Sequence, residues 1–254
     1  MFPYRDDNPT LRTPVVTMLL ILLNGLSWVI VQGMGTEPSL SASVCELGLI
    51  PGELLRAVPY GYRLPMGNGM VCLLTQEAGW YTPLTSMFLH GGWFHLIGNM
   101  WFLWLFGNNV EDSMGRVRFL VFYLLCGLAA AAVQVLSNPA SPLPMVGASG
   151  AIGGVMGAYV VLYPRVRVHL LVVLIFFVTT IRMPAWAMLG YWFLLQVLGG
   201  LPSLAGVGPE GGTAFWAHTG GFLAGALLVR VFQNPALVEA HRAWIRRHYA
   251  YAES

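Results

Sequence analysis

The feature that most constrains this chain is a series of long apolar runs separated by short polar segments. The hydrocarbon core of a bilayer is about 30 Å thick, so a helix needs about 20 mainly apolar residues to cross it. Charged residues make up only 9% of the chain, against about 25% in an ordinary soluble domain. Both observations indicate a membrane protein with several spans. The predicted spans are residues 14–33, 88–108, 117–136, 149–163, 184–201 and 215–232.

The positions of the arginines predict the orientation of these spans. All 13 basic residues are arginine, and cytoplasmic segments carry an excess of basic residues. With six spans and a cytoplasmic start, every arginine except Arg56 and Arg63 lies on an inner segment. The apolar stretch 168–181 is too short to span, and counting it as a seventh crossing would move Arg182 and the C-terminal arginines outside. We therefore expect this stretch to lie along the membrane or to re-enter it.

The predicted fold is all-α: a polytopic bundle of six transmembrane helices forming one domain over residues 1–254. Its core covers about residues 11–232, and residues 233–254 form a cytoplasmic tail, in which 239–250 has the pattern of a basic amphipathic helix. His169 and His241 lie beside arginines and are expected to be solvated. Both termini are predicted to be cytoplasmic. No transit peptide is evident, which favours a prokaryotic plasma membrane. The chain has no basic patch that would favour nucleic acid, and the sequence does not predict its oligomeric state.

One serine stands at the head of the glycine-rich run 146–157. Prolines precede this run, which predicts a helix that begins near Ser149 and stops before Pro164. Such a helix has about fifteen residues and is roughly 22 Å long, which is too short to cross a bilayer core of about 30 Å. Ser149 would therefore lie below the membrane surface, surrounded by protein and water. A hydroxyl in this position is a candidate nucleophile if a base reaches it.

Three separate spans place polar groups at a similar depth. Spans two, four and six all run inward from the outer side, and their outer halves carry His95 with Asn99, Ser149, and His218. Small-xxx-small glycine pairs in spans four and six allow their backbones to approach closely. A close approach is required for a hydrogen bond of about 2.6–3.2 Å between a serine and a histidine. The alternative for His95 and Asn99 is a purely structural hydrogen bond between helices.

These residues form motifs that resemble those of the rhomboid intramembrane serine proteases. The motifs are Gly147-Ala148-Ser149-Gly150, Ala217-His218-Thr219-Gly220-Gly221, and a segment from His90 through His95 to Asn99. The resemblance covers the predicted core from about Leu11 to Phe232. Each motif alone is weak, but their order and their positions on the spans are highly specific together.

The resemblance implies that Ser149 is the nucleophile of a serine endopeptidase and that His218 is its general base. The residues themselves agree with this, because a serine hydroxyl needs an imidazole to accept its proton. The apolar spans contain no carboxylate to orient that imidazole, which predicts a dyad in which packing positions His218. His95, Asn99 and the Ser149 backbone N–H are predicted to stabilise the oxyanion. The resemblance implies transmembrane substrates, cut after a small residue.

Other residues have supporting roles in this prediction. Gly147 and Gly150 flank the serine, and His90 is expected to form a structural hydrogen bond to neighbouring loop backbone. No cofactor or metal is predicted, because the H-E-x-x-H motif of zinc peptidases is absent. Cys45 and Cys72 both fall in the first outer loop, where a disulfide between them is a hypothesis.

The chain departs from the family pattern at two positions. Rhomboids commonly carry an aromatic residue one turn after the serine, against which the histidine packs; here that residue is Gly153. The Trp-Arg pair of the first loop appears as Trp80-Tyr81. Either another side chain fills the gap at Gly153, or His218 is held more loosely.

Two other classes of function are alternatives to the protease. One is a rhomboid-like pseudoprotease that binds transmembrane helices without cutting them, although such relatives usually lack the serine or the histidine. The other is a transporter with His95 and His218 as a proton relay, which would call for internal repeats or a paired acidic residue in the spans. Neither feature is evident.

Overall fold

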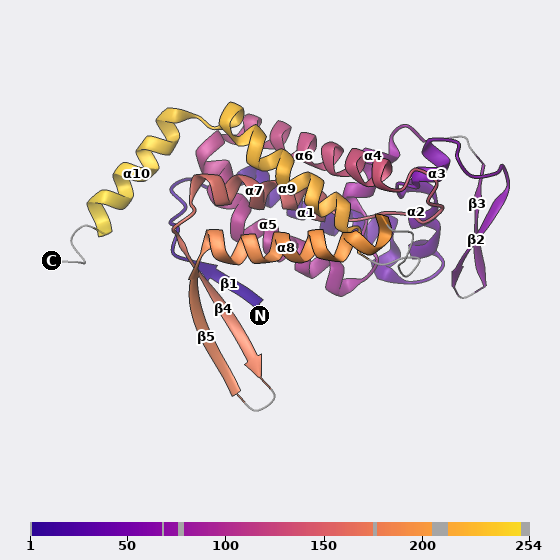
Figure 1. The fold of residues 1–254 in the computed structure, drawn as a ribbon, viewed down its shortest axis with the longest axis horizontal. Coiled ribbons are helices and arrows are strands. Elements are labelled where there is room, and N and C mark those ends of the chain that lie inside the picture. Colours follow the sequence, from indigo (N-terminus) through magenta and orange to yellow (C-terminus); the bar gives the residue numbers. More distant parts are fainter. Residues whose placement is uncertain (1, 68, 76–78, 175–176, 205–212, 250–254) are drawn as a thin grey trace.

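The computed structural model describes residues 2–67, 69–75, 79–174, 177–204 and 213–249, and within these ranges the chain is mostly helical. Its centre is a bundle of helices that run along one common direction (Figure 1). Each predicted apolar span corresponds to one helix of this bundle. These helices are α1 (Val15–Leu26), α5 (Trp93–Met114), α6 (Arg116–Ser137), α7 (Ser149–Leu162), α8 (Ala185–Leu204) and α9 (Phe215–Phe232).

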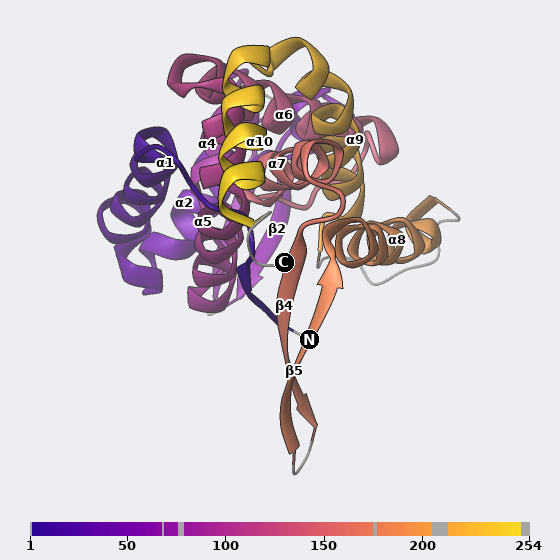
Figure 2. The ribbon, with the colours of Figure 1, turned by 90° about the vertical axis from the view of Figure 1, so that its left-hand side faces the viewer.

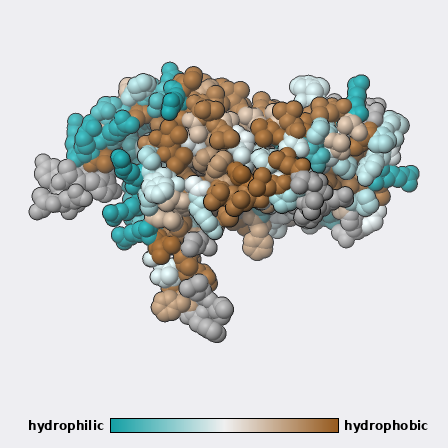
Figure 3. Space-filling model, in the orientation of Figure 1, coloured by the Kyte–Doolittle hydropathy of each residue, from teal (hydrophilic) through white to brown (hydrophobic). Residues whose placement is uncertain are grey.

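Three described helices, α6, α8 and α9, are long and apolar enough to cross a membrane. Helix α7 is shorter, as the sequence predicts, and α1 reaches Val31 only through a π-helical turn, Ser27–Val31. In Figure 3 the middle of the bundle is largely hydrophobic, and hydrophilic residues gather toward its two ends. This distribution fits a bundle that lies across a bilayer; the count of six spans stays a prediction.

Helix α7 is the central helix of the bundle. It packs against α5, α6, α8 and α9, and nearly all of its side chains are buried. Glycines allow this arrangement, because a Cβ atom added at Gly221 or Gly225 of α9 would lie 1.9 Å from a carbonyl oxygen of α7. No side chain fits in that space, so the two backbones are in direct contact.

The prediction of an all-α fold is wrong in part, because the described chain contains five strands. The stretch predicted to lie along the membrane forms a hairpin of β4 (Arg167–Leu174) and β5 (Phe177–Pro184), and β4 also pairs with β1 (Phe2–Asp6). The hairpin joins the end of α7 to the start of α8 and projects away from the helices (Figures 1 and 2). The stretch is rich in valine, isoleucine, threonine and phenylalanine, which favour strands.

The segment between α1 and α5 forms a small lobe. It contains α2 (Ser39–Leu47), α3 (Pro51–Leu54), α4 (Thr82–Thr85) and a hairpin of β2 (Tyr62–Gly67) and β3 (Met70–Leu74). A disulfide joins Cys45 of α2 to Cys72 of β3, which confirms the pairing suggested by the sequence. The Glu53 carboxylate also accepts a hydrogen bond of 3.0 Å from the Thr75 N–H. These contacts connect the helices and the hairpin of the lobe.

The C-terminal tail begins with α10 (Pro235–Tyr249), which confirms a helix there; the end of the predicted stretch, Ala250, lies outside the described residues. The expectation that His241 and His169 are solvated is wrong. His241 is buried, with its Nε2 3.0 Å from the Pro9 carbonyl oxygen. His169 is also buried, and its Nε2 lies 2.8 Å from Asp7 Oδ1. The N-terminal segment folds back over this end of the bundle and covers both rings.

Candidate active site

Ser149 and His218 meet at the end of the bundle where α7 and α9 begin. Ser149 is the first residue of α7, and His218 lies in the first turn of α9. The Ser149 Oγ atom is 2.7 Å from His218 Nε2, and both side chains are partly buried. This distance is that of a hydrogen bond between a hydroxyl and an imidazole. The glycine contacts between the two helices bring these groups within reach.

The glycines on either side of Ala148-Ser149 are required by the local geometry. Gly147 has a φ of +131°, and a Cβ atom there would lie 2.8 Å from His95 Nε2. Its N–H donates a 2.9 Å hydrogen bond to the Ser86 carbonyl oxygen. A Cβ atom at Gly150 would lie 2.6 Å from the Ala130 Cβ atom of α6. Any side chain at either position would therefore displace the serine or its neighbours.

Helix α5 brings His95 and Asn99 to the same end of the bundle. The Gly91 N–H donates to His95 Nδ1 at 3.2 Å, so in the neutral ring the proton lies on Nε2. That Nε2 atom is next to Gly147, directly before the serine. Asn99 lies one turn further along α5; its Nδ2 is buried and has no partner among the described residues. Both side chains therefore have a free N–H donor.

His90 is held differently from the prediction. Its backbone N–H and carbonyl both bond to the Gln32 side chain, each at 2.8 Å. The ring itself finds no hydrogen-bond partner in the described part of the chain and instead packs edge-on against His95, with ring centroids 5.1 Å apart. The expected ring-to-backbone hydrogen bond is therefore wrong, because the loop uses Gln32 to satisfy its backbone. His90 supports the site by packing.

Two residues of α8 that the sequence analysis missed contact the imidazole of His218. Gln196 Oε1 is 2.8 Å from His218 Nδ1. The Trp192 ring lies 5.8 Å from the His218 ring, centroid to centroid, at an interplanar angle of 36°. Gln196 is a polar residue inside an apolar run, and such residues are usually functional, so the signal was present. No signal in the sequence pointed to Trp192.

These contacts explain the departure at Gly153. A Cβ atom at this position would lie 3.0 Å from the His218 carbonyl oxygen. The backbone of α9 therefore occupies the space next to Gly153, and the aromatic ring that packs on His218 comes from α8 instead of α7. Of the two alternatives left by the sequence, the structure has the first in a changed form: another side chain, Trp192, packs against the His218 ring, while the α9 backbone fills the space beside Gly153.

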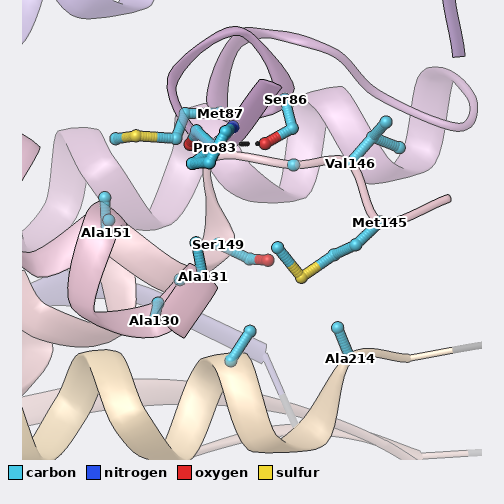
Figure 4. Close-up of a pocket in the computed structure, with 14 residues that line it drawn as sticks. Pro83, Ser86, Met87, Ala130, Ala131, Met145, Val146, Ser149, Ala151 and Ala214 are labelled. Atoms are coloured by element: carbon cyan, nitrogen blue, oxygen red, sulfur yellow. Dashed lines mark hydrogen bonds between the residues drawn. The ribbon is translucent and has the colours of Figure 1, made fainter. Parts of the chain in front are cut away.

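A small cavity adjoins Ser149 on the side of α6 (Figure 4). Its walls include the small side chains of Ala130, Ala131 and Ala214, with Met145 at the loop side. Figure 4 shows the Ser149 hydroxyl directed toward the space between Met145 and Ala214. Within the described ranges, no three His, Cys, Asp or Glu side chains form a group that could hold a metal ion.

Comparison with known proteins finds similar sequences. A family model described as Rhomboid domain matches residues 77–234. The rhomboid protease GluP of Bacillus subtilis is 42% identical over 94 residues, which are 36% of this chain and 18% of that protein. The putative rhomboid protease YdcA of the same organism is 33% identical over 106 residues, 42% of this chain and 48% of the relative.

Similar proteins also occur in eukaryotes. The chloroplastic Rhomboid-like protein 11 of Arabidopsis thaliana is 40% identical over 75 residues, 30% of this chain and 26% of its own length. The mitochondrial presenilin-associated rhomboid-like protein of Homo sapiens is 32% identical over 90 residues, 35% of this chain and 24% of its own length. The chain thus spans less than half the length of each of these relatives.

Proposed function

The chain belongs to the rhomboid family of membrane proteins, and from that membership we propose that it is an intramembrane serine endopeptidase. The observation that carries the proposal is the 2.7 Å contact between Ser149 Oγ and His218 Nε2. It joins the first residue of one buried helix to the first turn of another, where each depends on glycine contacts. A serine that served only as a helix cap would not need an imidazole at this distance.

The proposed reaction begins with attack of Ser149 Oγ on the carbonyl carbon of the scissile peptide bond. The Oγ proton moves to His218 Nε2 as the new C–O bond forms. The carbonyl oxygen becomes an oxyanion, for which His95 Nε2–H, Asn99 Nδ2–H and the Ser149 N–H are the proposed donors. Their support is that His95 Nε2 lies next to Gly147 and that Asn99 Nδ2 is buried without a partner among the described residues.

The first intermediate then collapses to an acyl-enzyme. The C–N bond breaks as His218 returns its proton to the leaving amine. A water molecule next gives a proton to His218 and attacks the acyl carbon. The bond between the acyl carbon and Ser149 Oγ then breaks as His218 returns this proton to Oγ, which releases the new carboxyl end and restores the serine. The cavity beside Ser149 has small walls, including Ala130 and Ala131, which supports a preference for a small residue before the cut.

The proposed substrates are transmembrane segments of other proteins, cut near the outer face of the membrane. A peptide bond inside a helix is shielded, so the cut segment should contain small or helix-breaking residues. Arg230 in the last turn of α9 and the arginines of α10 support cytoplasmic termini. A prokaryotic plasma membrane is the proposed location.

The test uses purified full-length protein in liposomes with a single-span protein substrate. We expect Ser149→Ala and His218→Ala each to abolish cleavage, whereas Ser137→Ala, which removes only a hydroxyl bonded within α6, should cleave normally. A fluorophosphonate probe should label the wild type and not Ser149→Ala. Undiminished cleavage by Ser149→Ala would overturn the mechanism.

The same experiment separates the protease from a rhomboid-like protein that binds transmembrane helices without cutting them. Such a protein would retain the substrate in a pull-down, would leave it intact, and would not react with the probe. That result would overturn the proposed activity while leaving the membership in the family unchanged.

A further inference from the structure

The amide of Gln196 has one orientation that satisfies both of its ends. Its Nε2 lies 3.3 Å from the Trp192 carbonyl oxygen one turn earlier in α8, and its Oε1 lies 2.8 Å from His218 Nδ1. In the opposite orientation the amide oxygen would face the carbonyl oxygen of Trp192, and two acceptors would oppose each other. The amide oxygen therefore faces the imidazole, and this oxygen can only accept a hydrogen bond.

This orientation determines the tautomer of His218. Because Gln196 Oε1 can only accept, His218 Nδ1 must carry a proton. In a neutral imidazole the other nitrogen, Nε2, then has a free lone pair. That lone pair faces Ser149 Oγ at 2.7 Å, which is the arrangement that a general base requires. With the other tautomer, Nε2 would be a donor and could not accept the serine proton.

We propose that Gln196 is the positioning residue of His218, so that the site consists of a serine, a histidine and a neutral amide from three helices. The inference rests on the proposed function, since a positioned base is useful only to a catalytic serine. Gln196 is buried, and Trp192 packs on the same imidazole from the same helix. Helix α8 thus determines both which nitrogen of the His218 imidazole carries the proton and how the ring is oriented.

The choice of an amide has a physical reason. A carboxylate at this place would be a charge buried within the membrane-spanning bundle, which costs several kcal/mol unless it is fully paired. The amide is neutral and accepts the same Nδ1–H hydrogen bond. It gives up the electrostatic stabilisation that a carboxylate would give the imidazolium formed during the reaction, but it retains the tautomer and the orientation.

The test compares two glutamines that both contact α9 near the site. Gln196→Met removes the acceptor of His218 Nδ1–H and keeps a side chain of similar length. Gln134→Met is the matched control, because Gln134 Oε1 accepts a 3.1 Å hydrogen bond from the Ala217 N–H and does not bond the imidazole. Gln196→Glu is the rescue variant, because a protonated carboxyl group can accept the same hydrogen bond with one oxygen and donate to the Trp192 carbonyl oxygen with the other.

We expect Gln196→Met to lower kcat about 10- to 100-fold with KM unchanged, since one hydrogen bond to the base is lost only from the reacting group. Gln134→Met should keep kcat within about 3-fold, and Gln196→Glu should recover part of the loss. The second readout is the ¹⁵N NMR signal of His218 in bilayers, assigned by its loss in His218→Asn. The wild type should hold the proton on Nδ1, and Gln196→Met should show a mixture of tautomers.

Each outcome decides the proposal. An unchanged tautomer in Gln196→Met would overturn it, even if activity falls, because the effect would then be structural. An unchanged kcat in Gln196→Met would overturn it as well. If the wild type cuts no substrate but its tautomer still depends on Gln196, the proposed protease activity fails while the positioning contact stands.

Discussion

The two ends of the helical bundle contain different kinds of buried polar group, neutral at one end and charged at the other. At the end where α5, α7 and α9 begin, the described side chains grouped at the site are Ser149, His95, Asn99, Gln196 and His218, and none of these five is a carboxylate or an arginine. At the end where these helices finish, the contacts use charge. Glu111 binds the start of α1, and Arg12 pairs with Asp112 at 3.2 Å.

The kind of polar group buried at each end indicates the role of that end. Neutral polar groups are cheaper to bury than charges, so the site end can place them close together where glycines let the backbones touch. At the charged end the buried carboxylates of Glu111 and Asp112 are paired with backbone N–H groups and with Arg12, and they fix the N-terminal segment to the bundle. We therefore expect close helix packing to control activity at the first end, and charged contacts to control stability at the second.

The largest effect is expected from the glycine contact that brings Ser149 and His218 together. Gly221→Ala would place a Cβ atom 1.9 Å from the Gly150 carbonyl oxygen, so α7 and α9 must separate. A displacement of about 1 Å at reacting groups can cost about 100-fold in rate. Cleavage by Gly221→Ala should fall by at least this factor. Gly190→Ala in α8 is the control, because nothing lies within 4 Å of its added Cβ atom, and normal cleavage is expected.

A Gly221→Ala variant that is folded and fully active would contradict the role of close packing at the site end. Thermal unfolding in detergent shows whether the variant is folded.

The sequence was sufficient to bring Ser149 and His218 together, because three motifs fall on apolar spans for which the arginines predict one direction and a similar depth. It also predicted the short helix α7, since Pro164 marks its end. It could not place Trp192 and Gln196 against His218, because their contacts depend on how α8 rotates and packs, and nothing local encodes that. Periodicity alone does not distinguish a short apolar helix from a strand, so the 168–181 hairpin was missed.

The second prediction concerns the charged end and is a loss of stability. The Glu111 carboxylate accepts hydrogen bonds from the Val16 N–H at 3.0 Å and from the Thr17 N–H and Oγ1 at 2.8 Å. It acts as the N-cap of α1, although it belongs to α5. Glu111→Leu should lower the free energy of unfolding by about 2–4 kcal/mol, because these donors stay buried without an acceptor.

The control for this prediction is Glu111→Gln, which retains one acceptor oxygen and should lose less stability. Thermal unfolding in detergent measures both variants. At temperatures where Glu111→Leu is still folded, its cleavage rate should equal that of the wild type. A lower rate there would mean that the charged end also shapes the site, and the division between the two ends would fail.

A third prediction concerns two neighbouring aspartates whose pKa values are shifted in opposite directions. Burial raises the pKa of Asp6 to about 6, despite the hydrogen bond from the Tyr159 hydroxyl. Burial would also raise the pKa of Asp7, but the hydrogen bond and charge of His169, with Arg5, lower it. Asp6 therefore contributes its full share of stability below its usual pKa, and this contribution is lost as the pH rises to about 6. Asp7 contributes to stability above its usual pKa, and its contribution is lost as the pH falls.

Asp6→Asn should accordingly be more stable than the wild type at pH 7, by about 2 kcal/mol after allowance for partial exposure, with the difference vanishing near pH 4. The amide oxygen of Asn can still accept the hydrogen bond from the Tyr159 hydroxyl group. Asp7→Asn should be less stable than the wild type at pH 7. Unfolding curves between pH 4 and 7 measure both. The same sign for the two variants would contradict the assignment.

The smallest effect on activity is expected from the disulfide, which lies in the lobe between α1 and α5. Replacing both Cys45 and Cys72 by serine opens a loop with a sequence separation of 27 residues, and such a loss typically costs about 2–4 kcal/mol. The cost should fall on the lobe, because the helices that carry Ser149 and His218 pack through their own glycines. Trypsin should then cut faster at the exposed Arg63 of β2, while cleavage of a transmembrane substrate stays within about 3-fold of the wild type. A large loss of activity together with intact helices would show that the lobe helps to form the site, and the contrast between the two ends of the bundle would then have to include a third region.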